Sequence, residues 1–276
     1  HTLVVNGRSI KVLQEKDPTK LPWKELAIDV VVESTGAFDS FEKAKVHVET
    51  AGARHAVITA PAKDDDGVFG KTILMGVNEH ELGSVPVTSN ASCTTNACAS
   101  VIWVLTQSLG MEAALLNTTH AYTATQSLVD SPVKGSDFRR GRAGAQNMGP
   151  SSTGAAMAVG RVIPEAKGNF DGIAIRVPVA CGSLADITFI SKRQTSVEEV
   201  NEILRAAQGE ERWRGILKVS DEQLVSSDVI GEPYAAIVDA KMTRVVGGKL
   251  VKVLSWYDNE FGYVSTLVKH VKKIPL

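Results

Sequence analysis

The feature that most constrains the fold is a β-α-β pattern in the first third of the chain. A short apolar run at residues 27–32 (AIDVVV) precedes a helical stretch at 38–51, and a second apolar run follows at 55–59 (HAVIT). Continuously apolar strands are typical of parallel sheets that are covered on both faces. Further strands are expected at 73–77 and 85–88. This order predicts a partial doubly wound (Rossmann-like) α/β domain of the kind that binds nucleotides.

The rest of the chain has a different texture, because strand patterns cluster there with few helices between them. Such clusters predict an α+β domain with a largely antiparallel sheet. The clearest helix, 197–207, begins with Ser196 and Glu199 as a capping box. Residues 132–150 are rich in Gly and Arg and predict an ordered functional loop. The strand patterns lie at 115–122, 172–177, 185–190, 235–240 and 250–256.

Composition excludes several classes of protein. The 276 residues are 43% hydrophobic, which is enough for two domains with their own cores. Lys plus Arg (30) nearly balance Asp plus Glu (31), so overall charge gives no reason to expect nucleic acid or a membrane surface as partner. No apolar run approaches the roughly 20 residues of a membrane span, and no signal-peptide pattern is present, so we expect a cytoplasmic protein.

The three cysteines are an odd number without CxxC spacing, which argues against a disulfide framework and against a zinc site. Cys93 lies where a strand gives way to a helical run at 97–105. The free amides and the dipole of a helix N-terminus should lower its thiol pKa and make it a nucleophile. The alternative is a small buried side chain, the interpretation we give to Cys98 and Cys181.

A thiolate nucleophile usually has a base, and His120 ends a predicted strand among hydroxyl residues. A structural histidine is the alternative. Thr123, Thr125, Thr153 with Gly154, and Arg176 supply hydroxyl, amide and guanidinium groups that hold phosphate. In the alternative interpretation, Arg176 pairs with a carboxylate and the threonines are strand residues.

Five motifs, in order, closely resemble those of the phosphorylating glyceraldehyde-3-phosphate dehydrogenase family. They are NASCTTN at 90–96, HAYTATQ at 120–126, STGAA at 152–156, RVP at 176–178 and WYDNEFGY at 256–263. The likeness runs in register from Val5 to the C-terminus. It implies an NAD-binding domain at 1–92, a catalytic domain at 93–258, and a C-terminal segment at 259–276 that returns to the first domain.

The resemblance implies a reaction and a role for each matching residue. Cys93 would attack the aldehyde of glyceraldehyde 3-phosphate, with His120 as base, and phosphate would release 1,3-bisphosphoglycerate from the resulting thioester. The substrate phosphate would lie near Thr123, Thr125 and Arg176. The attacking phosphate would lie near Ser92, Thr94, Thr153 and Gly154.

The same resemblance implies NAD as cofactor, in contact with Thr35, Gly36, Thr59 and Asn259, the last towards the nicotinamide carboxamide. Pro132 favours NAD, with NADP as the alternative. The family is also tetrameric, with the 132–150 loop at a subunit interface, so we expect a homotetramer. The chain contains no GxGxxG turn, and we expect a preceding segment to carry it.

Two other functions are consistent with these residues. Erythrose-4-phosphate dehydrogenase shares the thiol chemistry, although its relatives usually depart from the sequence after the histidine and near the C-terminus, where this chain does not. The second alternative is that the 276 residues alone are an inactive fragment, because the glycine-rich turn that holds the pyrophosphate is absent from them.

Overall fold

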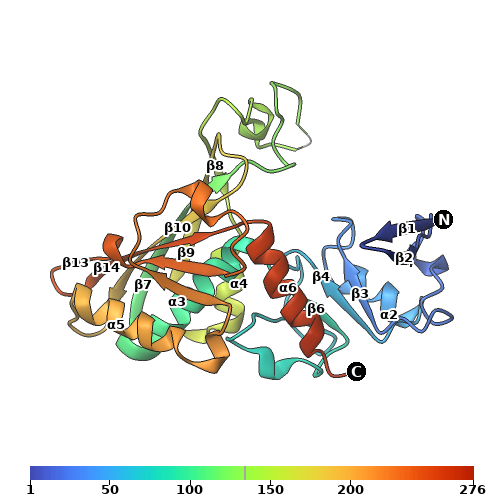
Figure 1. Cartoon of the computed structure of the whole chain (residues 1–276), viewed down its shortest axis with the longest axis horizontal. Coiled ribbons are helices and arrows are strands. Elements are labelled where there is room, and N and C mark those ends of the chain that lie inside the picture. The colour runs from blue at the N-terminus through green and yellow to red at the C-terminus, as the bar shows by residue number, and fades with distance from the viewer. Residues whose placement is uncertain (134) are drawn as a thin grey trace.

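The computed structural model describes residues 1–133 and 135–276 and contains two large sheets (Figure 1). The first sheet has four parallel strands, which confirms the predicted parallel arrangement. Its strand order is β3 (Val30–Glu33), β4 (His55–Ile58), β6 (Val87–Ser89) and β5 (Gly70–Thr72). The strand predicted at 73–77 is therefore wrong. These apolar residues form a buried turn, in which the Asn78 side chain accepts from Leu74 N (2.8 Å) and donates to Thr72 O (2.9 Å).

The helical stretch predicted at 38–51 forms two short helices, α1 (Phe41–Ala44) and α2 (Val46–Glu49). The chain starts with an antiparallel hairpin of β1 (Thr2–Val5) and β2 (Arg8–Lys11). Asn6 and Gly7 both have positive φ angles (48° and 74°), as a tight two-residue hairpin turn requires.

The second sheet has eight strands and is largely antiparallel, as predicted. The β7–β9 and β11–β12 pairs are parallel, and the other described pairs of this sheet are antiparallel. The strand order is β11 (Leu217–Ser220), β12 (Ala236–Asp239), β14 (Leu250–Tyr257), β10 (Ser183–Ser191), β7 (Met111–Ala121), β9 (Phe170–Val177) and β8 (Gly149–Ser152), with β13 (Arg244–Val246) paired to β14.

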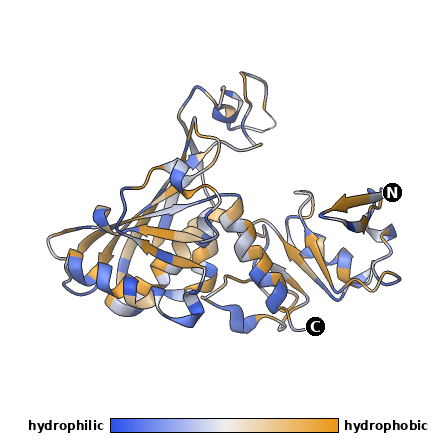
Figure 2. Cartoon of the chain, in the orientation of Figure 1, coloured by the Kyte–Doolittle hydropathy of each residue, from blue (hydrophilic) through white to orange (hydrophobic). Residues whose placement is uncertain are grey.

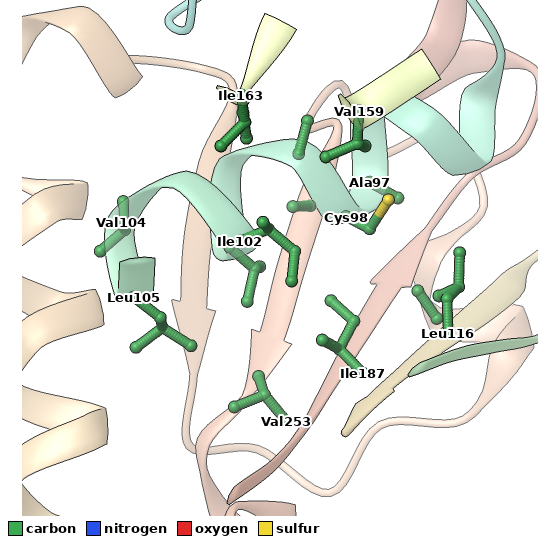
Figure 3. Close-up of a cluster of buried hydrophobic side chains, with 14 of the residues drawn as sticks. Ala97, Cys98, Ile102, Val104, Leu105, Leu116, Val159, Ile163, Ile187 and Val253 are labelled. Atoms are coloured by element: carbon green, nitrogen blue, oxygen red, sulfur yellow. The ribbon is translucent and has the colours of Figure 1, made fainter. Parts of the chain in front are cut away.

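The main core lies between this sheet and helices α3 (Cys93–Leu109), α4 (Ala155–Val162) and α5 (Val197–Gln208). In Figure 3, Ile102 and Leu105 of α3 lie opposite Ile187 and Val253 of the sheet. Burial of each such side chain contributes about 1.5–3 kcal/mol. The hydropathy colouring in Figure 2 places hydrophobic residues along the strands of both sheets. Cys98 belongs to this core, which confirms its interpretation as a buried apolar side chain.

Helix α5 confirms the predicted helix at 197–207. Only one of the two hydrogen bonds of the predicted capping box is present. Ser196 Oγ accepts a hydrogen bond from Glu199 N (3.2 Å). The Glu199 carboxylate instead accepts from Thr195 and Arg193, so it does not return a bond to the Ser196 backbone. Short 3-10 helices occur at Pro18–Lys20, Glu79–Glu81, Phe138–Gly141, Pro164–Ala166, Glu211–Trp213, Ser226–Val229 and Ala240–Met242.

The last helix, α6 (Phe261–Lys273), lies between the two sheets in Figure 1 and reaches back to the parallel one. Its His270 is hydrogen-bonded to Thr88 of β6, and its Lys273 pairs with Glu79. The predicted domain boundaries at residues 92 and 258 stay predictions.

The segment between β7 and β8 projects from the body of the molecule in Figure 1 and contains most of the predicted 132–150 loop, whose last two residues, Gly149 and Pro150, belong to β8. Lys134 lies outside the described residues. Hydrogen bonds tie the described part of the segment to itself, from Ser131 N to Gly141 O (2.9 Å) and from Ala143 N to Asp130 Oδ1 (2.8 Å). The segment is therefore internally ordered, as predicted.

Candidate active site

Cys93 is the first residue of α3, which follows the parallel strand β6 after a short turn at residues 90–92. The chain turns there through Ala91, whose φ of 54° is unusual for a residue other than glycine. Ser92 caps the helix, because its Oγ accepts a hydrogen bond from Thr95 N (3.0 Å). The Cys93 side chain therefore lies at a helix N-terminus, as predicted.

His120, near the end of β7, meets this cysteine. Its Nε2 lies 3.4 Å from Cys93 Sγ, so the structure brings together the two residues that the sequence proposed as nucleophile and base. The ring of Tyr257 packs edge-on against the imidazole, with the ring centroids 5.9 Å apart. Contact between two residues 27 positions apart was a prediction that only the fold could test.

The other ring nitrogen of His120 has two neighbours. Nδ1 lies 2.7 Å from Ala121 O and 2.6 Å from Arg176 Nη1. Arg176 Nη1 can only donate, so Nδ1 cannot bond to both neighbours in one tautomer. With the proton on Nδ1, the ring donates to Ala121 O, Arg176 Nη1 directs its own proton to Ala121 O (3.2 Å), and the Nε2 lone pair faces the thiol, as a base requires. Burial, together with the charge of Arg176, lowers the pKa of His120 to about 4, so the imidazole is neutral at neutral pH.

The prediction that the Cys93 thiol pKa is lowered is wrong when the thiol ionises without transferring its proton to His120. Burial raises this pKa, and the hydrogen bonds at Thr94 and the charge of Arg176 only partly offset it. The helix N-terminus favours the thiolate, but loss of hydration penalises the charge more strongly. Transfer of the proton to His120 leaves the net charge of the pair unchanged, so the thiolate–imidazolium pair avoids the burial of a single uncompensated charge.

Thr94, predicted beside the attacking phosphate, is buried and already engaged. Its Oγ1 lies 2.9 Å from Tyr257 Oη, which lies 2.8 Å from Thr118 Oγ1. A hydroxyl held in such a network is poorly placed to bind an incoming anion. The sequence reasoning assigned no role to Tyr257, although it lies within the last of the five motifs.

Thr125 and Arg176 line one small pocket, and Thr123 joins them through its Oγ1, 3.0 Å from Thr125 Oγ1. The structure therefore groups three residues predicted to bind the substrate phosphate. Within the described part of the chain, Arg176 pairs with no carboxylate, against the alternative interpretation. Arg140, which the sequence reasoning did not single out, also lines the pocket and donates to Ser151 Oγ (2.9 Å).

Thr153 and Gly154 lie at the start of α4, on a different element from this pocket. Thr153 Oγ1 accepts a hydrogen bond from Ala155 N (3.2 Å), and open space surrounds the position of a Cβ on Gly154. Ser92, the remaining residue predicted at the second anion site, keeps its hydroxyl near Thr95 Oγ1 (2.7 Å). The structure places these groups at two helix N-termini, where anions bind favourably.

The residues predicted to bind the cofactor lie at two places. Thr35 and Gly36 follow β3, and Thr59 follows the adjacent strand β4, so all three lie at the carboxyl edge of the parallel sheet. Thr35 N donates to Glu33 Oε1 (2.7 Å), and Thr59 Oγ1 donates to Glu33 O (3.1 Å). Asn259 precedes α6 and bonds to Ser183 beside the end of β7.

The other two cysteines have no catalytic setting, but the interpretation of Cys181 as a small buried side chain is wrong, because it is only half-buried and lies in the turn before β10. Burial raises the pKa of Cys98 to about 12. Burial and the neighbouring Asp258 carboxylate raise the pKa of Cys181 to about 11, and its Sγ donates to Asp258 Oδ1 (3.2 Å). Among residues 1–133 and 135–276, no cluster of three or more potential metal ligands occurs and no helix could cross a membrane.

Comparison with known proteins gives consistent matches. Residues 92–259 match the family model of the glyceraldehyde 3-phosphate dehydrogenase C-terminal domain, and residues 1–41 match that of its NAD binding domain. Glyceraldehyde-3-phosphate dehydrogenase of Borreliella burgdorferi is 46% identical, over 99% of this chain and 81% of the relative. The enzyme of Mycobacterium avium is 47% identical over 97% and 77%, and glyceraldehyde-3-phosphate dehydrogenase B of Aspergillus oryzae is 46% identical over 95% and 76%.

Proposed function

This chain belongs to the glyceraldehyde-3-phosphate dehydrogenase family, and from that membership we propose that Cys93 and His120 are its catalytic pair. It is an NAD-dependent oxidoreductase that converts glyceraldehyde 3-phosphate, phosphate and NAD to 1,3-bisphosphoglycerate and NADH. The observation that carries the proposed site is the 3.4 Å approach of Cys93 Sγ to His120 Nε2.

In the first step, His120 Nε2 takes the thiol proton as Cys93 Sγ bonds to the aldehyde carbon. The charge that develops on the carbonyl oxygen lies at the N-terminus of α3, where the Cys93 backbone N–H is a candidate oxyanion donor. Burial favours this arrangement, because a site with little water strengthens the interaction of the amide with the oxyanion.

The oxidation step needs NAD, and the residues present fit it. Thr35, Gly36 and Thr59 lie at the carboxyl ends of adjacent parallel strands, the usual place for a dinucleotide. Asn259 lies beside the catalytic pair, linked to the backbone of Ala121 through Ser183. When bound, NAD supplies the two-electron acceptor that aldehyde oxidation requires. His120 would first return the thiol proton to the oxyanion, which completes the hemithioacetal hydroxyl, and would take it up again when that oxygen becomes the thioester carbonyl.

The resulting acyl group would be a thioester on Cys93, which phosphate displaces. Arg176, with Thr123 and Thr125, would hold the phosphate that belongs to the substrate. Arg139 and Arg140 also line that pocket, and both pair with Asp137. Ser92, Thr153 and Gly154 would receive the attacking phosphate at the starts of α3 and α4.

The test uses the full gene product and follows NADH formation from glyceraldehyde 3-phosphate with phosphate present. We expect Cys93→Ser to lower kcat by at least about 10³-fold, because a hydroxyl replaces the nucleophilic thiol. Erythrose 4-phosphate serves as the competing substrate. Equal turnover by the serine variant would reject the nucleophile, and preference for erythrose 4-phosphate would reject the substrate.

We also propose a homotetramer. The outward face of the eight-stranded sheet exposes Leu115 (66%), Ile173 (52%) and Leu250 (43%), an apolar surface that a second copy could cover. Light scattering should give four times the subunit mass, and Leu115→Glu should reduce the size of the assembly. A wild-type monomer would reject the proposal.

A cytoplasmic location is our remaining proposal. A nucleophilic thiol works only while it is reduced, and reducing compartments keep it so. Cys93, Cys98 and Cys181 are all free thiols in this structure. Fractionation of the source cells should recover the protein with cytoplasmic markers, and recovery in an extracellular fraction would reject the proposal.

A further inference from the structure

The side-chain amide of Asn259 is held by two hydrogen bonds from the start of β10. Gly182 N lies 3.2 Å and Ser183 Oγ 2.8 Å from Asn259 Oδ1. A backbone N–H can only donate, so the atom that faces Gly182 must be the carbonyl oxygen of the amide. This assignment does not depend on telling oxygen from nitrogen in the side chain.

Ser183 provides a second, independent reason for the same orientation. Its Oγ accepts a hydrogen bond from Ala121 N (3.1 Å), which leaves its own proton for Asn259 Oδ1. Ser183 is 1% exposed, so water cannot easily replace either bond. Both neighbours of Oδ1 are thus donors, and the amide would lose both bonds if it turned over.

The backbone around this contact is fixed as well. Gly182 has a φ of 91°, and a Cβ there would lie 2.2 Å from Ser226 O, so the turn needs glycine. On the other side, Asp258 Oδ1 accepts from Glu260 N and Phe261 N (2.8 and 2.9 Å), and its Oδ2 accepts from Gly231 N (2.8 Å). These bonds hold the residue before Asn259.

The consequence is that the NH₂ group of Asn259 points away from Ser183 and is available to a ligand. Within the described residues, Asn259 Nδ2 has no hydrogen-bond acceptor. An NH₂ group can only donate, and the nicotinamide carboxamide offers one acceptor, its carbonyl oxygen. We propose that Ser183 is a positioning residue, which orients Asn259 so that its Nδ2 donates to the carboxamide oxygen of the cofactor.

Ser183 would also fix the position of the cofactor relative to the base, His120. It pairs with Tyr257 across β10 and β14, and its Oγ bonds to Ala121, the residue after His120. The same hydroxyl therefore ties the strand of His120 to the amide of Asn259. Loss of the Ser183 hydroxyl should weaken nicotinamide binding more than it changes the reactivity of Cys93.

This inference rests on the proposed function, and the experiment separates the two. Calorimetry on the full gene product measures Kd for NAD, for its 3-acetylpyridine analogue and for its thionicotinamide analogue. The first analogue keeps the carbonyl acceptor and lacks the NH₂ group, whereas the second keeps the NH₂ group and has a weak sulfur acceptor. We expect the acetylpyridine analogue to bind within about threefold of NAD and the thionicotinamide analogue about fivefold more weakly.

Ser183→Ala should raise Kd for NAD about fivefold and remove most of the discrimination between the two analogues. Ser183→Thr, which keeps the hydroxyl, should restore wild-type binding. Ser191→Ala is the matched control, since Ser191 is equally buried at the other end of β10 and its hydroxyl donates to Arg193 O. Asn259→Asp should weaken binding at least about tenfold, because a carboxylate oxygen would face the carbonyl.

Alkylation of Cys93 by iodoacetamide without cofactor provides a readout of the catalytic pair. Its pH profile should be the same in wild type and Ser183→Ala. Unchanged NAD affinity in Ser183→Ala, or tighter binding of the thionicotinamide than of the acetylpyridine analogue by wild type, would overturn the inference while the proposed function stood. Failure of wild type to oxidise glyceraldehyde 3-phosphate would instead overturn the function.

Discussion

Two buried histidines, His55 and His270, should make this protein sensitive to mild acid. His55 Nε2 lies 3.0 Å from Thr88 Oγ1, which lies 2.8 Å from His270 Nε2, and His270 Nδ1 lies 3.1 Å from Asn90 Oδ1. Burial lowers the pKa of His55 to about 4. Burial, and then the charge of His55, lower the pKa of His270 to about 3.

Every proton in this chain of bonds can be assigned for neutral rings. Asn90 Nδ2 donates to Thr266 Oγ1, so Asn90 Oδ1 accepts from His270 Nδ1. His270 Nε2 then accepts from the Thr88 hydroxyl, and His55 Nε2 donates to Thr88 Oγ1. A proton added to His270 Nε2 would reverse its bond to Thr88 and leave the Thr88 hydroxyl proton without that acceptor.

The direction in which pH changes stability follows from the histidine pKa values in the folded and unfolded states. The histidine pKa is about 6.5 in the unfolded chain, and it is lower in the folded protein. As pH falls below about 6.5, the unfolded state therefore binds protons first and stability decreases. Between about pH 7.5 and about pH 5, each ring should cost about 2 kcal/mol by this linkage.

His120, whose folded pKa is also about 4, adds a similar amount. The three histidines together should lower the free energy of unfolding by about 6 kcal/mol over this range. Carboxyl groups that are stabilised in the folded state act at lower pH, because their unfolded pKa values are near 4.

Urea unfolding of wild type and of His270→Gln at about pH 7.5 and about pH 5 measures how much His270 contributes to the loss of stability in acid. The variant lacks one titrating ring, so its loss on acidification should be smaller by about 2 kcal/mol. His80→Gln, at an exposed histidine, is the control and should behave like wild type. An acid-induced loss in His270→Gln as large as in wild type would refute the reasoning.

Three further substitutions test packing in the two parts of the protein. Leu116→Ala, at a core residue that is 2% exposed, should lower the free energy of unfolding by about 2–5 kcal/mol in urea titrations. Gly70→Ala would place a Cβ 2.2 Å from the Phe41 ring, so its Tm should fall, and Phe41→Leu in the same chain should recover part of the loss. Tyr257→Phe removes the hydroxyl that the buried Thr94 and Thr118 hydroxyls share as a hydrogen-bond partner, and calorimetry should detect a loss of about 1–3 kcal/mol.

The sequence by itself determined the local elements and the class of chemistry. Apolar patterns placed β4, β7 and the helix that begins at Cys93, and a capping residue placed the start of α5, because these signals act within a few residues. The same local information placed Cys93 at a helix N-terminus and named His120 and Arg176. It failed at residues 73–77, where an apolar run forms a buried turn held by the side chain of Asn78.

Only the tertiary structure decided how remote groups meet and what surrounds them. The contact of Cys93 with His120 depends on packing of α3 against β7, and the hold of Ser183 on Asn259 joins residues 76 positions apart. The raised pKa of the Cys93 thiol has the same origin, since desolvation depends on every segment packed around the sulfur. Hydrogen bonds and burial between distant segments are properties of the packed chain, and no local pattern encodes them.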